Sequence, residues 1–423
     1  MLVHVRFSQF EERAQIEEFG ELVRSAGTST AGIVLARRRA PQARVFVGEG
    51  KLEEIATLVK TEKAQLVIFN HELTPSQQRN LEKALECRVM TRTELILHIF
   101  ASRARTHEGQ LQVELAQLSH AQTRLVRGWT HLDRQKGGIG LKGAGETQIE
   151  LDARMLADRV AVIEGRLEKV RKQREQGRRR RRRAAVPSVA LVGYTNAGKS
   201  TLFNRLTDSR VLEADRLFAT LDPTLRRLAI DGAGEVVIAD TVGFIRDLPH
   251  TLVEAFKATL QEVVEATLLL VVVDATDVDL DERLEQVQAV LREIGAAAPQ
   301  LVVMNKIDEL ADARASIERD EAGAAARIWL SARTNEGVEL LRDAIAERVA
   351  GGIHSRHVLL AANAGRTRSW LYRQGAVERE ETAEDGSWML TVRLSDDALS
   401  RIAREPGVSL QGHRSVHRIS PSP

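Results

Sequence analysis

A glycine-rich turn between an apolar run and a helical pattern constrains this chain more than any other feature. The stretch VALVGYTNAGKSTLFNRL, from Val189, fits the spacing G-x-x-x-x-G-K-[ST]. Its fixed positions are Gly193, Gly198, Lys199 and Ser200. Such glycines let backbone N–H groups curl around phosphate oxygens, and the helix N-terminus adds its positive end. We expect Lys199 to reach the outer phosphates and Ser200 to bind Mg²⁺; a plain glycine turn is the alternative.

Later apolar runs end in polar residues that indicate which nucleotide binds. EVVIADTVGF ends its apolar part at Asp240, expected to hold Mg²⁺ through water, and continues to Gly243, whose N–H can meet a γ-phosphate. LVVMNKID ends in Asn305, Lys306 and Asp308. A carboxylate there accepts N1–H and the amino group of guanine, whereas adenine has neither group and leaves the carboxylate unpaired.

The run IWLSAR adds Ser331, Ala332 and Arg333, a turn that can back the base. These motifs each follow an apolar run, which is where open α/β sheets bind ligands, and together they resemble the translation-factor-like class of P-loop GTPases. The nucleotide-binding residues predicted from them are Gly193, Tyr194, Thr195, Asn196, Ala197, Gly198, Lys199, Ser200, Thr201, Phe218, Ala219, Thr220, Leu221, Asp222, Asp240, Thr241, Val242, Gly243, Asn305, Lys306, Ile307, Asp308, Ser331, Ala332 and Arg333.

A switch segment needs a hydroxyl to complete the Mg²⁺ shell, and RLFATLDPTLRRL offers Thr220 and Thr224. We choose Thr220 because FATLDPT resembles the FTTLxP pattern of related GTPases; an ordinary surface loop is the alternative. The predicted Mg²⁺ contacts are therefore Ser200, Thr220 and, through water, Asp240.

The residue that drives hydrolysis is not obvious. Many small GTPases place a glutamine after D-x-x-G to orient the attacking water, but this chain has Phe244, so unassisted hydrolysis should be slow. Asn196 matches GTPases that use this asparagine to hold an activating K⁺ beside the phosphates. A hydrogen bond from Asn196 to a switch backbone, or a macromolecular activator, are the alternatives. The predicted catalytic residues are Lys199, Thr220, Gly243 and Asn196.

Patterning divides the 423 residues into four units of an α/β protein. These are an N-terminal α/β subdomain (1–90), an antiparallel helical hairpin (91–184), a central P-loop GTPase domain with a mostly parallel sheet (185–350) and a small α+β C-terminal domain (351–423). In the first unit, AGIVLA, RVFVG and LVIF are predicted strands. KLEEIATLVK and TPSQQRNLEKAL are predicted helices, the second with Thr74 as N-cap and Pro75 at its first position.

Two apolar stripes joined by a glycine-rich loop (137–145) predict the hairpin. The stripes are Leu111, Leu115, Leu118 and Leu125, then Ile149, Leu156, Val160, Ile163, Leu167 and Val170. Six arginines (178–183) follow, without an apolar face, and predict a basic linker. In the last unit, Asp385-Gly386 within GAVEREETAEDGSWMLTVRL predicts a hairpin turn with a helix on each side.

The remaining composition points to the cytoplasm. Cys87 is the single cysteine, which excludes an internal disulfide framework, and we interpret it as a small buried hydrophobe. MLVHVRFSQFEER does not resemble a signal peptide, and ATLLLVVVDAT is too short to span a membrane. We expect a monomer without stable membrane association.

The segment GGIGLKGAGETQIELDAR, from Gly137, identifies a family. Placed before GYTNAGKST, FATLDPTLRR, DTVGFI and NKID, it closely resembles the HflX family of ribosome-associated GTPases over about residues 25–350. One departure is Ala153, where the family often has a basic residue. The resemblance implies binding to the large ribosomal subunit, ribosome-stimulated GTP hydrolysis, and splitting or rescue of stalled ribosomes under stress. It also implies weak ATP hydrolysis through the N-terminal region, although no second phosphate loop is present there.

Charge independently supports an RNA partner. The net charge is only +2, but arginines and lysines cluster in the N-terminal half, where phosphate contacts need no sequence readout. Aromatic residues make up 4% of the chain, so base stacking is not the expected mode, with Trp129 beside the glycine-rich loop as an exception. The candidate RNA contacts are Gly137, Gly138, Lys142, Gly143, Arg178, Arg179 and Arg180.

Three other functions fit parts of the pattern. A ribosome-assembly or RNA-modification GTPase shares the nucleotide motifs, but the glycine-rich hairpin argues against it. An RNA-binding scaffold with little turnover is consistent with Phe244. A GTPase that binds anionic lipid through the arginine tract lacks the accompanying apolar face.

Overall fold

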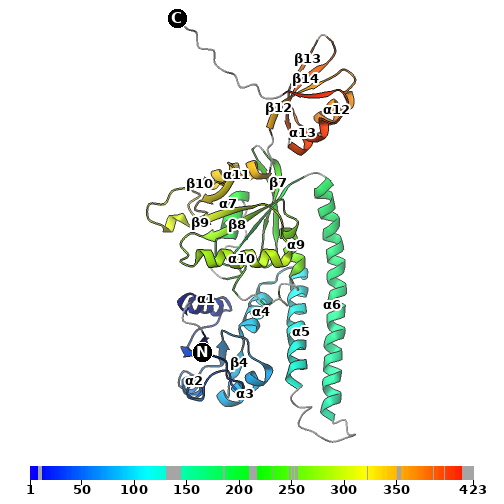
Figure 1. Ribbon diagram of the computed structural model, residues 1–423. Coiled ribbons are helices and arrows are strands. Elements are labelled where there is room, and N and C mark those ends of the chain that lie inside the picture. Colours follow the sequence, from blue (N-terminus) through cyan, green and yellow to red (C-terminus); the bar gives the residue numbers. More distant parts are fainter. Residues whose placement is uncertain are drawn as a thin grey trace.

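The computed structural model describes residues 1–7, 12–129, 144–183, 186–208, 217–231, 233–246, 249, 252, 256–321, 323–349, 354–383, 385–394 and 396–411. Within these ranges the chain is an α/β protein with a sheet near each end of the molecule and a larger sheet between them (Figure 1). A long pair of helices runs beside the first two sheets (Figure 1). This confirms the predicted fold class.

The first sheet is parallel, with strand order β2-β1-β3-β4. Its strands are β1 (Leu2–Arg6), β2 (Ile33–Arg37), β3 (Leu66–Phe69) and β4 (Arg88–Met90), and its helices are α1 (Glu12–Ser25), α2 (Glu49–Thr61) and α3 (Pro75–Leu85). Thr74 caps α3 as predicted, because its hydroxyl accepts a hydrogen bond from Gln77 N at 3.2 Å. Cys87 is half-buried at the edge of this core.

The predicted strand RVFVG is wrong. Residues 43–45 form a turn, closed by a bridge between Gln42 and Phe46, and Phe46 has a left-handed φ of 66°. The turn buries Val45, Phe46 and Val47, so these apolar side chains enter the core without a strand partner. Conversely, the first strand, β1, was not predicted, although it occupies the middle of the sheet.

Three helices connect the first sheet to the second: α4 (Arg92–Arg103), α5 (His107–Trp129) and α6 (Ala144–Arg183). Helices α5 and α6 lie side by side and antiparallel (Figure 1). On α6 the partly or fully buried positions include Leu156, Val160, Ile163, Leu167 and Val170, which confirms this part of the predicted stripe. Arg159 Nε donates to Glu114 Oε1 at 2.8 Å and ties the two helices together.

The arginine tract, predicted as a basic linker or boundary, is the last part of a helix. The helix α6 continues through Arg183, since arginine is a strong helix former and needs no apolar face to extend an existing helix. The predicted contacts Gly137, Gly138, Lys142 and Gly143 lie outside the described residues.

The central sheet has the order β10-β11-β9-β8-β5-β7-β6 and is parallel except for its two edge strands. The strands are β5 (Ser188–Gly193), β6 (Thr224–Ile230), β7 (Gly234–Asp240), β8 (Leu268–Asp274), β9 (Gln300–Asn305), β10 (Ser316–Arg319) and β11 (Ala325–Trp329). The helices are α7 (Lys199–Thr207), α9 (Lys257–Val264), α10 (Leu280–Ile294) and α11 (Val338–Val349). Since β5, β7, β8 and β9 are parallel neighbours, their carboxyl ends bring the predicted motifs to one edge.

The last sheet is antiparallel, in the order β13-β14-β12-β15. It contains β12 (His354–Leu360), β13 (Val377–Thr382), β14 (Trp388–Leu394) and β15 (Val408–Gln411), with helices α12 (Gly365–Arg373) and α13 (Asp396–Ile402). The β13–β14 hairpin, its turn at Asp385-Gly386 and both flanking helices confirm the prediction. No helix in the described part of the chain is long and apolar enough to cross a membrane.

Candidate nucleotide-binding site

The loop after β5 forms a tight turn over the start of α7. Gly198 has a left-handed φ of 86°, and a Cβ there would lie 2.2 Å from Asn305 Nδ2, so this position admits only glycine without rearrangement. Asn305 in turn donates from Nδ2 to Ala197 O at 2.9 Å. The phosphate loop is therefore fixed by the last residue of β9.

Lys199, the first residue of α7, is buried within this loop. Its Nζ donates to Tyr194 O at 2.7 Å and to Gly193 O at 3.2 Å. Burial lowers the pKa of Lys199 to about 8, while the Asp240 carboxylate opposes that shift. The ammonium points into the turn, where phosphate oxygens could replace the carbonyls as its acceptors.

Three oxygen-bearing side chains meet beneath the loop. Ser200 Oγ lies 2.8 Å from Thr220 Oγ1 and donates to Asp240 Oδ2 at 2.8 Å, and Thr220 Oγ1 donates to the same oxygen at 2.9 Å. Thr224, the alternative to Thr220, begins β6 instead.

Asp240 is the acidic member of this group. Burial raises its pKa, an effect that the Ser200 hydroxyl and Lys199 oppose. Its other oxygen, Oδ1, is buried without a hydrogen-bond partner among the described residues. Two hydroxyls and a carboxylate with an unused oxygen are the hard donors that Mg²⁺ prefers, so the group fits this ion.

The residues predicted to recognise the base also meet. Ala332 N donates to Asn305 Oδ1 at 2.9 Å, and Ser331 Oγ donates to Asp308 Oδ1 at 2.5 Å. Arg333 pairs with the other Asp308 oxygen from an exposed position. The Asp308 carboxylate is therefore held at the sheet edge. The exposed Arg333 side chain that pairs with it could be displaced by a base.

The segment after β7 lies against the phosphate loop. Phe244 N donates to Gly193 O at 3.0 Å, and Phe244 O accepts from Thr195 N at 2.8 Å. A Cβ on Gly243 would lie 2.9 Å from Lys199 Nζ, so the backbone at Gly243 lies in close contact with the phosphate loop. The Phe244 side chain is only 1% exposed and belongs to the core, which agrees with its inability to orient water.

Asn196 is the exposed residue of the loop, with a left-handed φ of 62°. It lines a cavity of about 780 Å³ between the phosphate loop, helix α1 and the segment after β8. Asn196 also lines a separate, smaller hollow together with Lys199 and Ser200, which is the side on which the potassium hypothesis places the ion.

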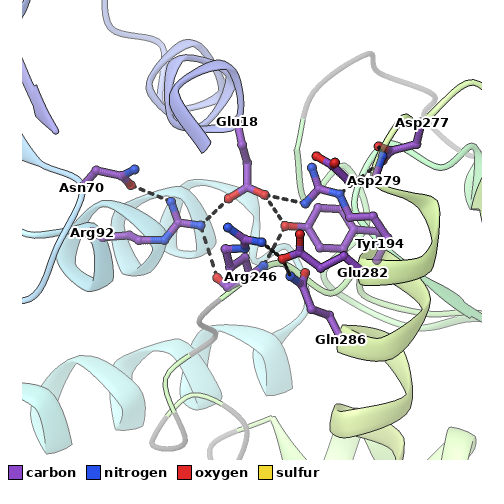
Figure 2. Close-up of polar contacts among 10 residues, drawn as sticks. Glu18, Asn70, Arg92, Tyr194, Arg246, Asp277, Asp279, Glu282 and Gln286 are labelled. Atoms are coloured by element: carbon purple, nitrogen blue, oxygen red, sulfur yellow. Dashed lines mark hydrogen bonds and ion pairs between the residues drawn. The ribbon is translucent and has the colours of Figure 1, made fainter. Parts of the chain in front are cut away.

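Two predicted nucleotide-binding side chains point elsewhere. The Asp222 carboxylate lies on the start of α5, where it accepts from Arg105 N at 3.0 Å. The Tyr194 ring turns away from the loop toward helix α1, and its hydroxyl donates to Glu18 (Figure 2). Only the backbone of Tyr194 faces the phosphate loop interior, through its carbonyl.

A buried polar cluster around Glu18 was missed by the sequence analysis (Figure 2). Arg92 Nη2 donates to Glu18 Oε1 at 2.5 Å and to Arg246 O at 3.2 Å, and Arg283 Nη1 donates to Glu18 Oε2 at 2.8 Å. Tyr194 OH also accepts from Arg246 N at 2.7 Å. Burial by itself would raise the pKa of Glu18, but Arg92, Tyr194 and Arg283 together hold it below its ordinary value. The cluster joins α1 and α4 to the phosphate loop and to the segment after Gly243.

Family models cover most of the chain. Residues 13–101 match "GTP-binding GTPase N-terminal", 103–181 "GTP-binding GTPase Middle Region", 188–306 "50S ribosome-binding GTPase" and 316–414 "HflX C-terminal domain".

Whole-length relatives also match. GTPase HflX of Escherichia coli is 57% identical over 93% of this chain and 93% of its own. GTPase HflX of Magnetococcus marinus is 43% identical over 94% of this chain and 92% of its own. A solved GTP-binding protein from Sulfolobus solfataricus, in complex with GDP, is 25% identical, with a TM-score of 0.43 over 82% of this chain and 98% of that one.

Proposed function

Because the chain belongs to the HflX family of GTPases, we propose that it binds the large ribosomal subunit and splits or rescues stalled ribosomes under stress, using GTP hydrolysis. The matched description "50S ribosome-binding GTPase" supports the ribosomal partner. We place this activity in the cytoplasm, in a protein of four units with the predicted boundaries.

The observation that carries the hydrolytic part of the proposal is the meeting of Ser200, Thr220 and Asp240. Their oxygens lie within 2.9 Å of one another beneath the phosphate loop. These three side chains would hold Mg²⁺, which would supply positive charge to stabilise the phosphate oxygens of the nucleotide.

The chain's own residues carry the other roles. The Lys199 ammonium leaves the loop carbonyls and binds phosphate oxygens. The Asp308 carboxylate accepts hydrogen bonds from both guanine N–H groups once Arg333 moves aside. The N–H of Gly243 meets the γ-phosphate. This contact would order the segment after Gly243 beside the phosphate loop, and loss of the γ-phosphate on hydrolysis would release it.

Two finer properties belong to the same proposal. The Asn196 amide oxygen would hold K⁺ near the phosphates and compensate for the missing glutamine. Ribosomal RNA would be contacted by the glycine-rich loop (137–145) and by Arg178–Arg180, at opposite ends of α6. Weak ATP hydrolysis by the N-terminal region is a further property to measure in the same preparations.

Sedimentation of intact ribosomes tests the proposal directly. Ribosomes are incubated with the protein and GTP, GDP or a non-hydrolysable GTP analogue, and the subunits are separated on a sucrose gradient. We expect free subunits with GTP or the analogue and intact ribosomes with GDP. The variant S200A is the matched control, because it keeps the surface of the protein and loses a hydroxyl of the predicted Mg²⁺ site. Intact ribosomes under every condition would refute the splitting activity.

One observation favours a second candidate, an RNA-binding scaffold for which GTP is a structural ligand. The residue after Gly243 is buried in the core, so no polar side chain stands where water is oriented in many GTPases. Tight GTP binding without turnover, alone or with ribosomal particles, would favour the scaffold.

A further inference from the structure

The switch segment that carries Thr220 is held by the N-terminal half of the chain. Leu217 N donates to Ser25 Oγ, at the end of α1, at 3.0 Å. The Phe218 ring meets Phe100 of α4 edge-on, with centroids 4.7 Å apart. These contacts fix the start of the segment before it reaches the phosphate loop.

Asp222 fixes the other end of the segment on the first turn of α5. Its Oδ2 accepts from Arg105 N and from Thr106 N, both at 3.0 Å, and its Oδ1 accepts from the Thr106 hydroxyl. The Thr106 hydroxyl itself accepts from Gly109 N at 3.0 Å, as an N-cap does. A carboxylate from a distant part of the sequence thus occupies the positive end of a helix, where negative charge is favourable.

Gly109 shows that the fit is specific. A Cβ on Gly109 would lie 2.2 Å from Asp222 Oδ1 and 3.1 Å from Cγ, so any other residue would push the carboxylate out. Gly109 lies in the third position of α5, where alanine would favour the helix itself. Its presence is explained by the space that Asp222 needs.

We propose that Asp222 is a positioning residue that holds Thr220 toward Ser200 and Asp240 by anchoring the switch segment to the N-terminus of α5. Asp222 lies two positions after Thr220, a span of about 7 Å at most, so displacement of one moves the other. The same anchor lies at the base of the α5–α6 hairpin. The position of the hairpin and the occupancy of the metal site are therefore thermodynamically linked. The factor by which a hairpin movement changes the Mg²⁺ affinity equals the factor by which Mg²⁺ changes the equilibrium of that movement.

This inference rests on the proposed function, because Thr220 acts only with Mg²⁺ and a γ-phosphate. A merely structural role for Asp222 would affect every nucleotide alike. A positioning role acts on the triphosphate state alone, since GDP has no γ-phosphate to order the switch.

The test compares D222A, D222N and G109A with the unaltered protein and with D231A, an exposed aspartate in the β6–β7 turn. We measure the affinity for a fluorescent non-hydrolysable GTP analogue and for fluorescent GDP, each over a Mg²⁺ titration. D222A and G109A should weaken the analogue about five-fold, equivalent to about 1 kcal/mol for a lost cap, and raise the half-saturating Mg²⁺ concentration. GDP affinity should not change. D222N should recover part of the loss, because its amide oxygen still accepts from backbone N–H groups.

The outcomes distinguish a failure of this inference from a failure of the proposed function. Wild-type values in both D222A and G109A would overturn this inference and leave the proposed function intact. Equal losses for the analogue and for GDP would also overturn it, because they indicate a general structural role. If the unaltered protein binds the analogue without any Mg²⁺ dependence, the proposed function fails and this inference fails with it.

Discussion

Removal of the Tyr194 hydroxyl tests whether the buried cluster holds the segment after Gly243 against the phosphate loop. In Y194F, Glu18 loses a hydrogen-bond donor and Arg246 N loses its acceptor at 2.7 Å. A hydrogen bond to a charged group contributes about 1.5–3 kcal/mol, and a neutral one about 1 kcal/mol. The ring remains, and with it the Arg283 guanidinium 3.9 Å from its centroid. We therefore expect local opening of this segment to become easier by about 2 kcal/mol, a conservative fraction of that sum.

Hydrogen exchange of a peptide that contains residues 243–246 measures this opening, since its amides report local unfolding. Exchange should be about 30-fold faster in Y194F, the equivalent of about 2 kcal/mol. The control is Y372F, which removes a tyrosine–glutamate hydrogen bond of 2.6 Å from an exposed site in the last unit. Y372F should leave the peptide unchanged.

A double-mutant cycle with E18Q makes the reasoning refutable. Tyr194 and Glu18 interact directly, so the two substitutions together should cost less than the sum of their separate effects. Additive effects, or the same exchange rate in Y194F and the unaltered protein, would show that the cluster does not restrain this segment.

Three further predictions follow from the site. GTP hydrolysis should be faster in K⁺ than in Na⁺ at equal ionic strength. N196A should abolish this difference, while its hydrolysis rate should still depend on Mg²⁺. Equal rates of the unaltered protein in the two salts would contradict the potassium hypothesis. The affinity for the GTP analogue should fall as the pH rises through about 8, because the pKa of Lys199 is lowered to about 8 and only the ammonium form attracts phosphate. The affinity of K199R should not fall over this range, because arginine stays charged. A flat profile for the unaltered protein from about pH 7 to 9 would contradict this prediction. D308A should lose about 100-fold of its preference for GTP over ATP in competition binding, since the buried carboxylate no longer pairs with guanine; an unchanged preference would assign recognition to other groups.

Local patterns predicted the parts of the fold whose causes are local. The capping box at Thr74, the strand–turn–helix of the phosphate loop and the stripe on α6 each depend on neighbours within a few positions. RVFVG failed because alternating apolar residues can also be buried by a turn, and only the positive φ of Phe46 distinguishes the two. The helical conformation of the arginine tract was not predicted, because an existing helix extends on propensity alone.

The long-range contacts could not be predicted from sequence. Tyr194 and Glu18 are 176 positions apart, and Asp222 and Arg105 are 117 positions apart, so no spacing rule connects them. Both tyrosine and aspartate lie inside motifs that predict nucleotide contacts, which is why their side chains were assigned to the nucleotide. The one signal of a different role was Gly109 in the first turn of a helix, and its meaning depends on the fold.

GTP turnover by the purified protein, alone and with large ribosomal subunits in K⁺ buffer, tests the central claim most directly. We expect slow turnover by the protein alone, because Phe244 orients no water, and strong stimulation by large subunits. Nucleotide binding with no stimulation by any ribosomal particle would contradict it.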